Sequence, residues 1–483
     1  MKLKDLKNKK ILILGLGREG ESSFLFLRKK FPEKILGVAD VLEFKDLPFQ
    51  VQKIIQKDKK VRVHFGKDYL KSLKNYNVII KSPGIAPNKI KPFLKRGQII
   101  TSQTEIFFQE CQGKIIGVTG TKGKSTTATL IYKILKNGGF KVYLVGNIGK
   151  PPLFYLEKFN HQNIFVYELS SHQLFGLRKS PQISVFLNIY PEHLDYYQSF
   201  QEYFKAKQNI ALHQKEKDYF IFNCQKELRR FARKVKSQKI PFCLSKKPLV
   251  EFYSRQSKIP NGCWVQRGDI ILIFNFKKEK ILKVKNVPLL GKFNLLNVMP
   301  AIIVGKIFNV SPKVIERTIR TFRGLPHRLE FVGKFKGIKF YNNSLATLPE
   351  ATIEAIESLG KNLQTILLGG FDRGVSFHSL AQKLWQSKIK NIILFPESGL
   401  RIWQEILATE KKGRKKFSHV FLVQNMKDAV KLSFQYTEKD KICLLSPASP
   451  SFGLFKDYKE RGNLFKKYVR YFGKKKKALD TPN

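Results

Sequence analysis

The chain has 483 residues, of which 42% are hydrophobic, so it can bury several cores and exceeds one ordinary domain. Lysine and arginine total 90 against 37 acidic residues, and the net charge of +53 favours nucleic acid, anionic membrane or anionic small substrates without choosing among them. No apolar run approaches the ~18 residues that cross a bilayer, which excludes an integral membrane protein. The N-terminal stretch lacks the features of a signal peptide, so we expect a cytoplasmic protein.

The five cysteines show no pairing pattern. They are scattered without a CxxC pair, and an odd number cannot form a closed disulfide framework. We therefore expect no such framework, and a reducing cytosol fits best. The cysteines are Cys111, Cys224, Cys243, Cys263 and Cys443.

Strand-like apolar runs alternate with helix-length amphipathic stretches, which is typical of an α/β protein with mostly parallel sheets. Block 1–109 opens with the strand ILILGLG and a glycine turn, and contains ILGVAD, VRVHFG and NVIIKSPG. This order predicts a Rossmann-like domain. Basic residues are spread along the whole length, and KKYVRYFGKKKK at 466–477 is the one dense cluster, so a general lysine bias explains the charge as well as a binding surface does.

Block 110–323 starts with the strand KIIGVTG and carries turn residues between short strands at 245–285, which predicts an antiparallel addition to its main sheet. Block 324–483 begins with a predicted strand pair, LEFVGKFKGIKFYNN. It continues with the strands TILLGG, NIILFP, HVFLVQ and KICLLSP. We therefore predict three α/β domains, of which the central one resembles P-loop ATPases and the outer two are Rossmann-like.

The strongest local motif is GVTGTKGKSTTATL at 117–130, a strand that runs through glycines into a helix. Glycine N–H groups can face phosphate oxygens, Lys124 can neutralise their charge, and the Ser125 hydroxyl can ligate Mg²⁺. Val118 stands where the general phosphate loop has a glycine, so the spacing is a shorter variant. A chance glycine turn is the alternative, but strand, turn, lysine, hydroxyl and helix occur in order. We expect ATP and Mg²⁺, with ATP contacts from Gly120, Thr121, Lys122, Gly123, Lys124, Ser125 and Thr126.

The sequence GTKGKSTT resembles the GT-x-GK-[ST]-T loop of the Mur ligase and folylpolyglutamate synthetase superfamily. Matching segments follow in the order of that family, so the resemblance covers essentially the whole chain. They are GNIG, YELSSHQL, NIYPEHLDYYQSFQEYFKAKQNI, GKFNLLN and GLPHRLE.

Three further residues complete the expected catalytic and metal site around Lys124 and Ser125. Glu168 ends an apolar strand, a usual place for a carboxylate near phosphates, although it could be an ordinary surface carboxylate. His193 read alone is a plain loop or core histidine, and Lys207 read alone is a solvated lysine. The resemblance implies that His193 is a Mg²⁺ ligand or orienter and that Lys207 is carbamylated and bridges the metal site.

The resemblance also implies that Asn294 and Asn297 contact the nucleotide, although both could be helix caps. Phe293 stands where the family often has histidine. Arg328 matches an arginine that reaches the ATP phosphates, a task that suits its planar fork of donors.

The N-terminal GLGREGES and SPGI resemble the glutamate-adding member of the family, which holds UDP-N-acetylmuramoyl-L-alanine. Asp40 ends the second strand, where a ribose or uracil partner could lie. An NAD enzyme would look similar here, but the phosphate loop argues against it. The expected precursor contacts are Gly17, Arg18, Glu19, Asp40, Ser82, Gly84 and Asn147.

The segment LLSPASPSFGLFKDYKERGNLF resembles the D-glutamate site of the same member, and LLGGFDRGVSF supports it, although strand-end loops are commonly rich in small and charged residues. The family aspartate of the first motif is Gly453 here. Where the family reads N-D-S-K-A-T-N, Asn343 replaces the aspartate and Leu345 the lysine, which leaves the choice between D- and L-glutamate open. The expected glutamate contacts are Thr347, Arg373, Ser451, Phe452 and Tyr458.

The resemblance therefore implies ATP-dependent ligation of D-glutamate to UDP-N-acetylmuramoyl-L-alanine through an acyl phosphate, by a protein expected to be a monomer. Three alternatives stay open: another Mur-type or folylpolyglutamate-type amide ligase, a noncatalytic member, and a basic nucleic-acid-binding NTPase.

Overall fold

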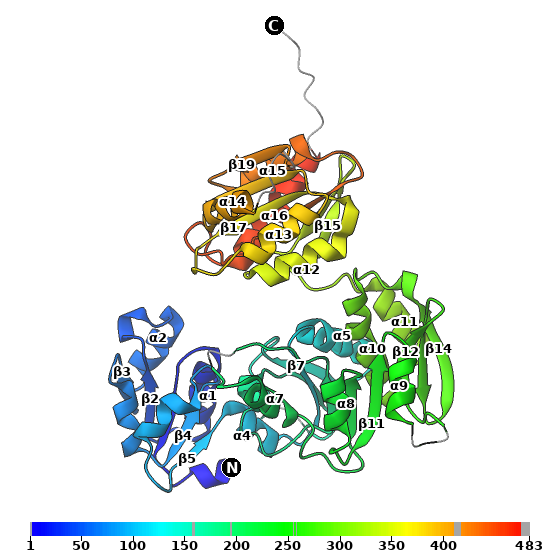
Figure 1. The fold of residues 1–483 in the computed structure, drawn as a ribbon. Coiled ribbons are helices and arrows are strands. Elements are labelled where there is room, and N and C mark those ends of the chain that lie inside the picture. The colour runs from blue at the N-terminus through cyan, green and yellow to red at the C-terminus, as the bar shows by residue number, and fades with distance from the viewer. Residues whose placement is uncertain are drawn as a thin grey trace. The chain divides into compact units, whose positions relative to one another are not determined.

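The computed structural model describes residues 2–156, 160–193, 196–254, 256, 258–409 and 417–474. The chain forms two compact units, one of Met1–Val287 with Lys292–Thr321 and one of Pro288–Gly291 with Phe322–Asn483. The first unit contains two sheets and the second contains one (Figure 1).

The first sheet has five parallel strands in the order β3-β2-β1-β4-β5. All residues of its central strand β1 are buried, as expected for a parallel strand covered on both faces. The strands are β1 (Ile11–Leu14), β2 (Leu36–Asp40), β3 (Val61–Phe65), β4 (Val78–Lys81) and β5 (Ile99–Thr101). The helices are α1 (Arg18–Lys30), α2 (Phe49–Lys57), α3 (Pro87–Ile90) and α4 (Gln103–Glu110).

The second sheet has nine strands in the order β14-β13-β12-β11-β10-β9-β6-β8-β7. Strands β6 to β12 pair in parallel, whereas β12, β13 and β14 pair antiparallel, which confirms the predicted addition. The strands are β6 (Lys114–Thr119), β7 (Val142–Gly146), β8 (Ile164–Glu168), β9 (Ile183–Phe186), β10 (Tyr219–Asn223), β11 (Gln238–Cys243), β12 (Gly262–Gln266), β13 (Asp269–Phe274) and β14 (Lys277–Lys283). The helices are α5 (Lys124–Asn137), α6 (Ser171–Leu174), α7 (Phe200–Gln208), α8 (Lys226–Ala232), α9 (Lys247–Phe252), α10 (Lys292–Ile307) and α11 (Pro312–Thr321).

The first two sheets share one hydrophobic core. It contains Ile13 of β1 and Ile115 of β6 together with Phe107 of α4. The Phe107 ring lies 5.2 Å from Phe165 and 5.8 Å from Tyr167, both of β8. Helix α4 therefore packs the first sheet against the second.

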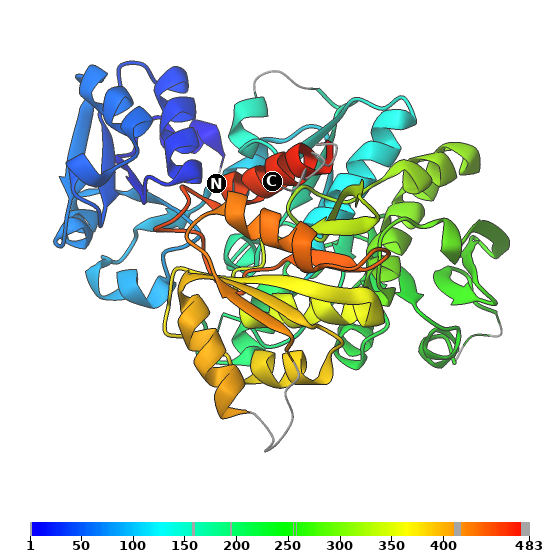
Figure 2. The ribbon, with the colours of Figure 1, turned by 90° about the horizontal axis from the view of Figure 1, so that it is seen from above.

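The sheet of the second unit has six strands in the order β15-β16-β20-β17-β18-β19, of which only the β15–β16 pair is antiparallel. Its strands are β15 (Glu330–Phe335), β16 (Ile338–Asn342), β17 (Leu363–Gly370), β18 (Asn391–Glu397), β19 (His419–Leu422) and β20 (Ile442–Leu445). Helices lie on both faces of this sheet (Figure 2). Ile366 of β17 packs with α12, α13 and α14 on one face, and its neighbour Leu367 packs with α15 and α16 on the other. These helices are α12 (Pro349–Leu359), α13 (His378–Gln386), α14 (Ser398–Ala408), α15 (Met426–Tyr436) and α16 (Tyr458–Lys474).

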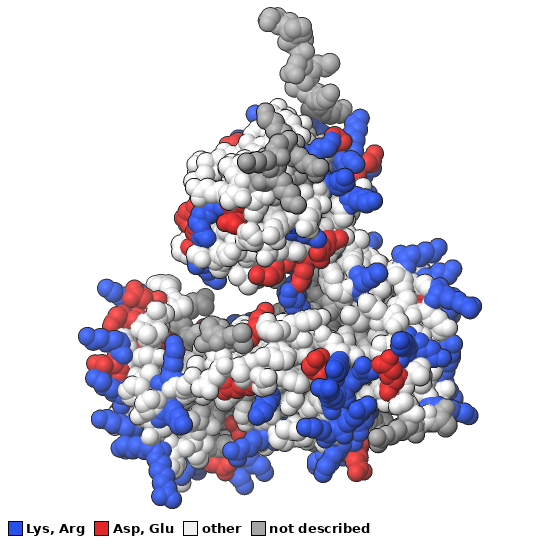
Figure 3. Space-filling model, in the orientation of Figure 1, with Lys and Arg blue, Asp and Glu red and all other residues white. Residues whose placement is uncertain are grey.

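These sheets confirm the predicted α/β class, and every strand named from the sequence is present. Among the described residues, no helix is both long and apolar enough to cross a membrane. Residues 475–477 of the basic cluster lie outside the described residues. On the face shown in Figure 3, basic side chains are spread over each unit and are not gathered in one stripe.

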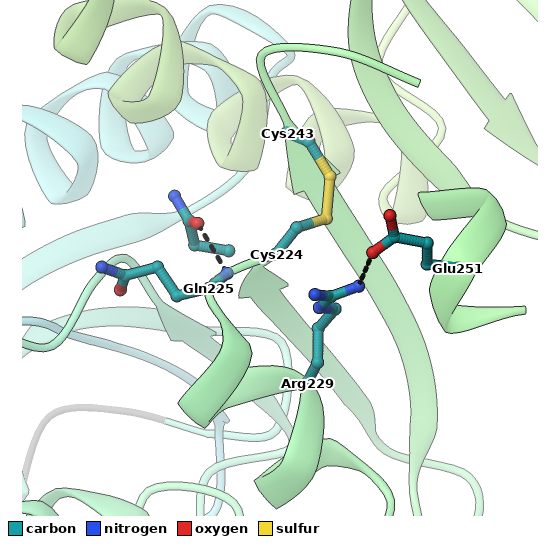
Figure 4. The surroundings of a disulfide bond; sticks show 6 residues. Cys224, Gln225, Arg229, Cys243 and Glu251 are labelled. Atoms are coloured by element: carbon teal, nitrogen blue, oxygen red, sulfur yellow. Dashed lines mark hydrogen bonds and ion pairs between the residues drawn. A yellow bond between two sulfur atoms is a disulfide. The ribbon is translucent and has the colours of Figure 1, made fainter. Parts of the chain in front are cut away.

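The expectation drawn from the cysteines is wrong at one pair. Cys224 and Cys243 follow or end the neighbouring strands β10 and β11, and they form a disulfide (Figure 4). Parallel pairing of these strands brings the two Cα atoms to 5.5 Å, a normal disulfide spacing that local sequence does not reveal. An ion pair of 2.6 Å between Arg229 and Glu251 joins α8 to α9 beside it. Cys111, Cys263 and Cys443 are free.

Candidate active site

The phosphate loop connects β6 to α5, and its two glycines adopt conformations that other residues avoid. Gly120 has φ +154° and Gly123 has φ +87°. A side chain at Gly123 would collide with the Asn297 amide, and one at Gly120 would press on Leu187. The loop can therefore close on α10 and on the end of β9 only because both positions are glycine.

Two lysines converge on the carbonyl of Gly120. Lys124 Nζ donates to this oxygen at 2.9 Å and to Thr121 O at 2.7 Å, and Lys207 Nζ donates to the same Gly120 oxygen at 2.9 Å. Lys207 is only 1% exposed, so it is not the solvated lysine that its local sequence suggests. Burial, reinforced by the Lys124 ammonium, holds the pKa of Lys207 well below its usual range.

The expected metal-binding side chains surround the same loop. Glu168 at the end of β8 is buried, and its carboxylate acts electrostatically on Lys207, while Ser125 lies in the first turn of α5. His193, at φ +58°, is exposed, and its ring lies 6.1 Å from the ring of Tyr203. The described residues contain no group of three His, Cys, Asp or Glu side chains that could hold a metal. Mg²⁺ needs few protein ligands, since water and phosphate supply the others, so one carboxylate and one hydroxyl at this loop fit it.

Helix α10 lies against the phosphate loop through its amides. Thr127 of α5 donates to Asn297 O at 3.0 Å, and the Asn297 side chain donates to Asn294 Oδ1 at 3.0 Å. Asn297 is buried beside Gly123. The structure thus brings Gly123 of the predicted phosphate loop next to the predicted Asn297 of α10. The bond from Thr127 to Asn297 joins positions 170 apart in the sequence.

The glycine turn between β1 and α1 is held by Asp40 and Ser82. The Asp40 carboxylate accepts from Leu16 N at 2.6 Å and from Leu42 N at 3.0 Å, so it organises the turn in addition to any contact with a ligand. Ser82 Oγ donates to Gly15 O at 2.7 Å. A side chain at Gly84 would meet no neighbouring atom, so this part of the SPGI segment is open.

Arg18 and Glu19 connect this turn to the second sheet. Arg18 donates to Asn147 O at 3.2 Å and also to Gly149 O, and Gln173 Nε2 donates to Glu19 Oε1 at 2.5 Å. Burial raises the pKa of Glu19, although the bond from Gln173 and nearby cations oppose this shift. The structure therefore brings Arg18 and Asn147 together and commits the Arg18 guanidinium to backbone carbonyls, while Glu19 is bonded to Gln173.

Lys81, which the sequence did not single out, is a partly buried cation at the same place. Its Nζ donates to Ser82 O at 3.2 Å and to Ile85 O at 2.7 Å. Burial lowers its pKa to about 8, while Glu19 acts in the opposite direction. The amine therefore fixes the positions of the Ser82 and Ile85 carbonyls at the two ends of the SPGI segment.

In the second unit, Arg461 of α16 joins two loops that carry expected glutamate contacts. It is fully buried and donates to Ser344 Oγ, Ser344 O and Pro450 O at 3.0, 2.9 and 3.1 Å. Thr347 lies in the first loop, and the buried Ser451 lies in the second. The family motif contains this arginine, but nothing in its local sequence indicated its burial.

The loop after β17 completes this edge of the third sheet. Phe371 N donates to Pro450 O at 3.0 Å, and the Phe371 ring lies 6.2 Å from the ring of Phe452. Arg373 is exposed two residues further on, and Tyr458 begins α16. The expected glutamate contacts therefore come from three loops and one helix start at the carboxyl edge of one sheet, the usual ligand edge of such a fold.

Asn343, which replaces the family aspartate, uses both ends of its side-chain amide in hydrogen bonds within the second unit. Its side chain donates to Ser446 Oγ at 3.0 Å and accepts from Leu329 N at 3.1 Å. Leu329 directly follows Arg328, so Asn343 anchors the segment that carries the expected phosphate-binding arginine. Leu345 is partly buried, and its backbone N–H donates to His327 O at 3.0 Å.

A phosphate loop with two converging lysines is typical of an enzyme that uses a nucleotide. Comparison with known proteins shows the family to which the chain belongs. The Mur ligase middle domain matches residues 118–305. The UDP-N-acetylmuramoylalanine–D-glutamate ligase of Acetivibrio thermocellus is 31% identical over 474 residues, 96% of this chain and 97% of the relative. The ligase of the same name from Caldicellulosiruptor bescii is 32% identical over 472 residues, 96% and 98% of the two chains. The chain therefore belongs to the Mur ligase family.

Solved structures share the fold. The UDP-N-acetylmuramate-alanine ligase of Thermotoga maritima superposes with a TM-score of 0.55 at 16% identity, over 97% of this chain and 100% of that one. The MurF ligase of Thermotoga maritima in complex with ADP gives a TM-score of 0.54 at 15% identity and covers 98% of each chain.

Proposed function

We propose that the protein joins D-glutamate to UDP-N-acetylmuramoyl-L-alanine with hydrolysis of ATP to ADP and phosphate, in peptidoglycan precursor synthesis. The observation that carries this proposal is the convergence of Lys124 and the buried Lys207 on the phosphate loop. It is supported by relatives that match at 31% and 32% identity along nearly their whole length.

In the first step, the terminal carboxylate of the precursor attacks the γ-phosphorus of ATP and ADP leaves, which gives an acyl phosphate. Lys124 exchanges its bonds to Gly120 and Thr121 carbonyls for phosphate oxygens and neutralises their charge. Asn294 and Asn297 contact the nucleotide from α10, and Arg328 adds a fork of donors from the second unit. A Mg²⁺ ion held by Ser125, Glu168 and His193 would supply further charge neutralisation.

Lys207 suits carbamylation because burial lowers the pKa of its amine well below the usual range, which favours the uncharged form. An uncharged amine adds CO₂ and loses a proton, which converts a donor into an anionic oxygen ligand. The carbamate would contribute its oxygens to the same metal site, next to Gly120.

In the second step, the glutamate amine attacks the acyl carbon and phosphate leaves as the amide forms. In this proposal Arg373 and Ser451 hold the glutamate carboxylates, with Thr347, Phe452 and Tyr458 at the same edge of the sheet. At the other end of the reaction, Gly17, Glu19, Ser82 and Gly84 surround the expected precursor turn.

The proposed division of labour follows the sheets: residues 1–109 bind the precursor, 110–323 bind ATP, and 324–483 bind the amino acid. We assign the protein to the cytoplasm because ATP is available there. The cysteines do not support this assignment, since Cys224 and Cys243 form a disulfide. We also propose that the protein is a monomer.

The test is phosphate release from ATP and Mg²⁺ with UDP-N-acetylmuramoyl-L-alanine, comparing D-glutamate, L-glutamate, L-alanine, diaminopimelate and no amino acid. Release that depends on D-glutamate is the expected result. Release with a different amino acid alone would overturn the substrate assignment, and release stimulated only by RNA or DNA would overturn the ligase assignment.

A further inference from the structure

Asn188, which lies just beyond the end of β9, forms two hydrogen bonds with the backbone of the phosphate loop. Its side chain accepts a hydrogen bond from Lys122 N at 2.8 Å through Oδ1 and donates to Lys122 O at 3.0 Å through Nδ2. One amide group therefore satisfies both the N–H and the C=O of a single loop residue. This paired contact fixes the orientation of the peptide groups on either side of Lys122.

The backbone of the same segment adds further contacts. Thr121 N donates to Asn188 O at 3.0 Å, and Tyr190 N donates to Thr121 Oγ1 at 3.0 Å. The Thr121 hydroxyl also lies 3.0 Å from the hydroxyl of Tyr203 in α7. Residues 188–190, here called the clasp, therefore hold the outer side of the loop by backbone and side chain.

The clasp also determines which loop groups can meet phosphate. The N–H groups of Thr121 and Lys122 are already bound to Asn188, so neither is available to a phosphate oxygen. Gly123 N and the first amides of α5 remain to face phosphate oxygens, as expected at a helix N-terminus. The prediction that Lys122 binds ATP is thus restricted to its side chain, which is exposed.

We propose that Asn188 is a positioning residue for ATP, which holds the phosphate loop in its binding conformation without touching the nucleotide. The proposal rests on the proposed ATP site. Without the clasp the loop must be ordered by the nucleotide itself, and this ordering weakens binding. Two neutral hydrogen bonds of ordinary strength correspond to about a tenfold increase in Kd for ATP.

The experiment compares Asn188→Ala with Asn163→Ala in the full-length protein. Asn163 is a suitable control because its buried amide also binds backbone, donating to Asn160 O at 3.1 Å, and because it precedes β8, at the end of that strand opposite to Glu168. Kd values for ATP and ADP are measured by calorimetry, KM values for all three substrates by phosphate release, and unfolding midpoints by urea titration. Asn188→Ala should raise the Kd and KM for ATP about tenfold and leave the KM values of precursor and glutamate within twofold. Asn163→Ala should change only the unfolding midpoint.

Asn188→Asp provides a second, independent test if the alanine variant does not fold. The aspartate keeps an acceptor for Lys122 N–H, but it places a negative charge opposite Lys122 O and near the bound phosphates. ATP carries more negative charge than ADP, so this variant should weaken ATP more than ADP, which a purely structural role would not do.

The outcomes separate the two proposals. Wild-type protein that does not bind ATP would overturn the proposed function. Wild-type protein that binds ATP, with both Asn188 variants within twofold of its Kd, would overturn the role of Asn188 alone. Equal losses of affinity for ATP, precursor and glutamate would also overturn it, because they would mark a general folding defect.

Discussion

The guanidinium of Arg461 donates to both the hydroxyl and the carbonyl oxygen of Ser344, 117 positions earlier in the chain. Its remaining described bond reaches Pro450 O in a different loop. A single buried side chain therefore sets the spacing of the loops that carry Thr347 and Ser451.

Arg461→Met should separate these loops, because it removes the donors and leaves buried oxygens unsatisfied. We expect the free energy of unfolding to fall by roughly 3 kcal/mol and the KM for glutamate to rise about tenfold, with the KM for ATP unchanged. Urea titration and steady-state kinetics measure both effects. Arg470→Met is the control, since Arg470 is exposed on the same helix. A folded Arg461→Met variant with normal glutamate KM would contradict this role.

Lys207→Arg should abolish carbamylation and place a guanidinium where the carbamate is proposed. Burial lowers the pKa of Lys207, which favours the uncharged amine that adds CO₂, whereas a guanidinium cannot add it. We expect kcat to fall at least about a hundredfold. In ¹³C-bicarbonate, wild-type protein should show a carbamate resonance that Lys207→Arg lacks. A carbamate signal of equal intensity in both proteins would place the modification elsewhere.

Lys81→Met should change how stability depends on alkaline pH. Burial lowers the pKa of Lys81 to about 8 from an ordinary value of 10.5. Between these values the unfolded chain holds the proton and the folded chain does not, so the free energy of unfolding rises with pH. The contribution is at most about 1.4 kcal/mol per pH unit, and the full cost of burying the ammonium applies below pH 8. Urea titrations from pH 7.5 to about 10 should give a shallower slope for Lys81→Met than for wild type.

The control for that measurement is Lys89→Met, because Lys89 is exposed on nearby α3. Its pH slope should match that of wild type. Identical slopes in all three proteins would show that Lys81 keeps its proton in the folded chain throughout this range.

The disulfide should stabilise the second sheet. It closes a sequence separation of 19 residues, for which the loss of unfolded-chain entropy predicts about 3 kcal/mol. Cys224→Ala combined with Cys243→Ala should lower the free energy of unfolding by about that amount, whereas Cys263→Ala, in the neighbouring strand, serves as the buried-thiol control. In denaturant, a thiol reagent should modify three cysteines before reduction and five after it. Five reactive thiols without reductant would refute the bond.

Asn343→Asp tests whether the family aspartate can be restored. The carboxylate keeps the acceptor for Leu329 N but loses the donor to Ser446, so we expect about 1 to 2 kcal/mol of destabilisation and no gain in ATP affinity. Asn362→Asp, at an exposed site of the same unit, is the matched control. A lower KM for ATP in Asn343→Asp would show that the carboxylate is free to serve the nucleotide.

The fold was largely predictable because its strands are short apolar runs bounded by glycine and turn residues. The phosphate loop was also predictable, since Gly120, Gly123 and Lys124 are adjacent in sequence and each has a chemical reason to be there. The sequence could not show that Lys207 is buried, because burial depends on Gly120, 87 positions away. The resemblance to the family supplied this residue.

Other contacts were missed for the same physical reason. Asn188 meets Lys122 across 66 positions, and Cys224 meets Cys243 only because β10 and β11 are neighbours. Polar side chains that bind distant backbone carry no periodic pattern, so apolar spacing cannot locate them. Asn188 is the first residue of the motif NIYPEHLD, which the sequence analysis had recognised. Its place at the end of a strand was the one feature of the sequence that could have indicated a role.

The shared core of the first two sheets has a consequence for substrate length. Phe107 packs against Phe165 and Tyr167, so the turn at Gly15 and the loop at Gly120 belong to one packed body. Packed interiors resist stretching, and the separation of these two glycine turns is therefore constant. For the proposed reaction, a nucleotide-linked acid bound at the Gly15 turn must therefore span a fixed separation before its carboxylate reaches a γ-phosphate at the Gly120 loop.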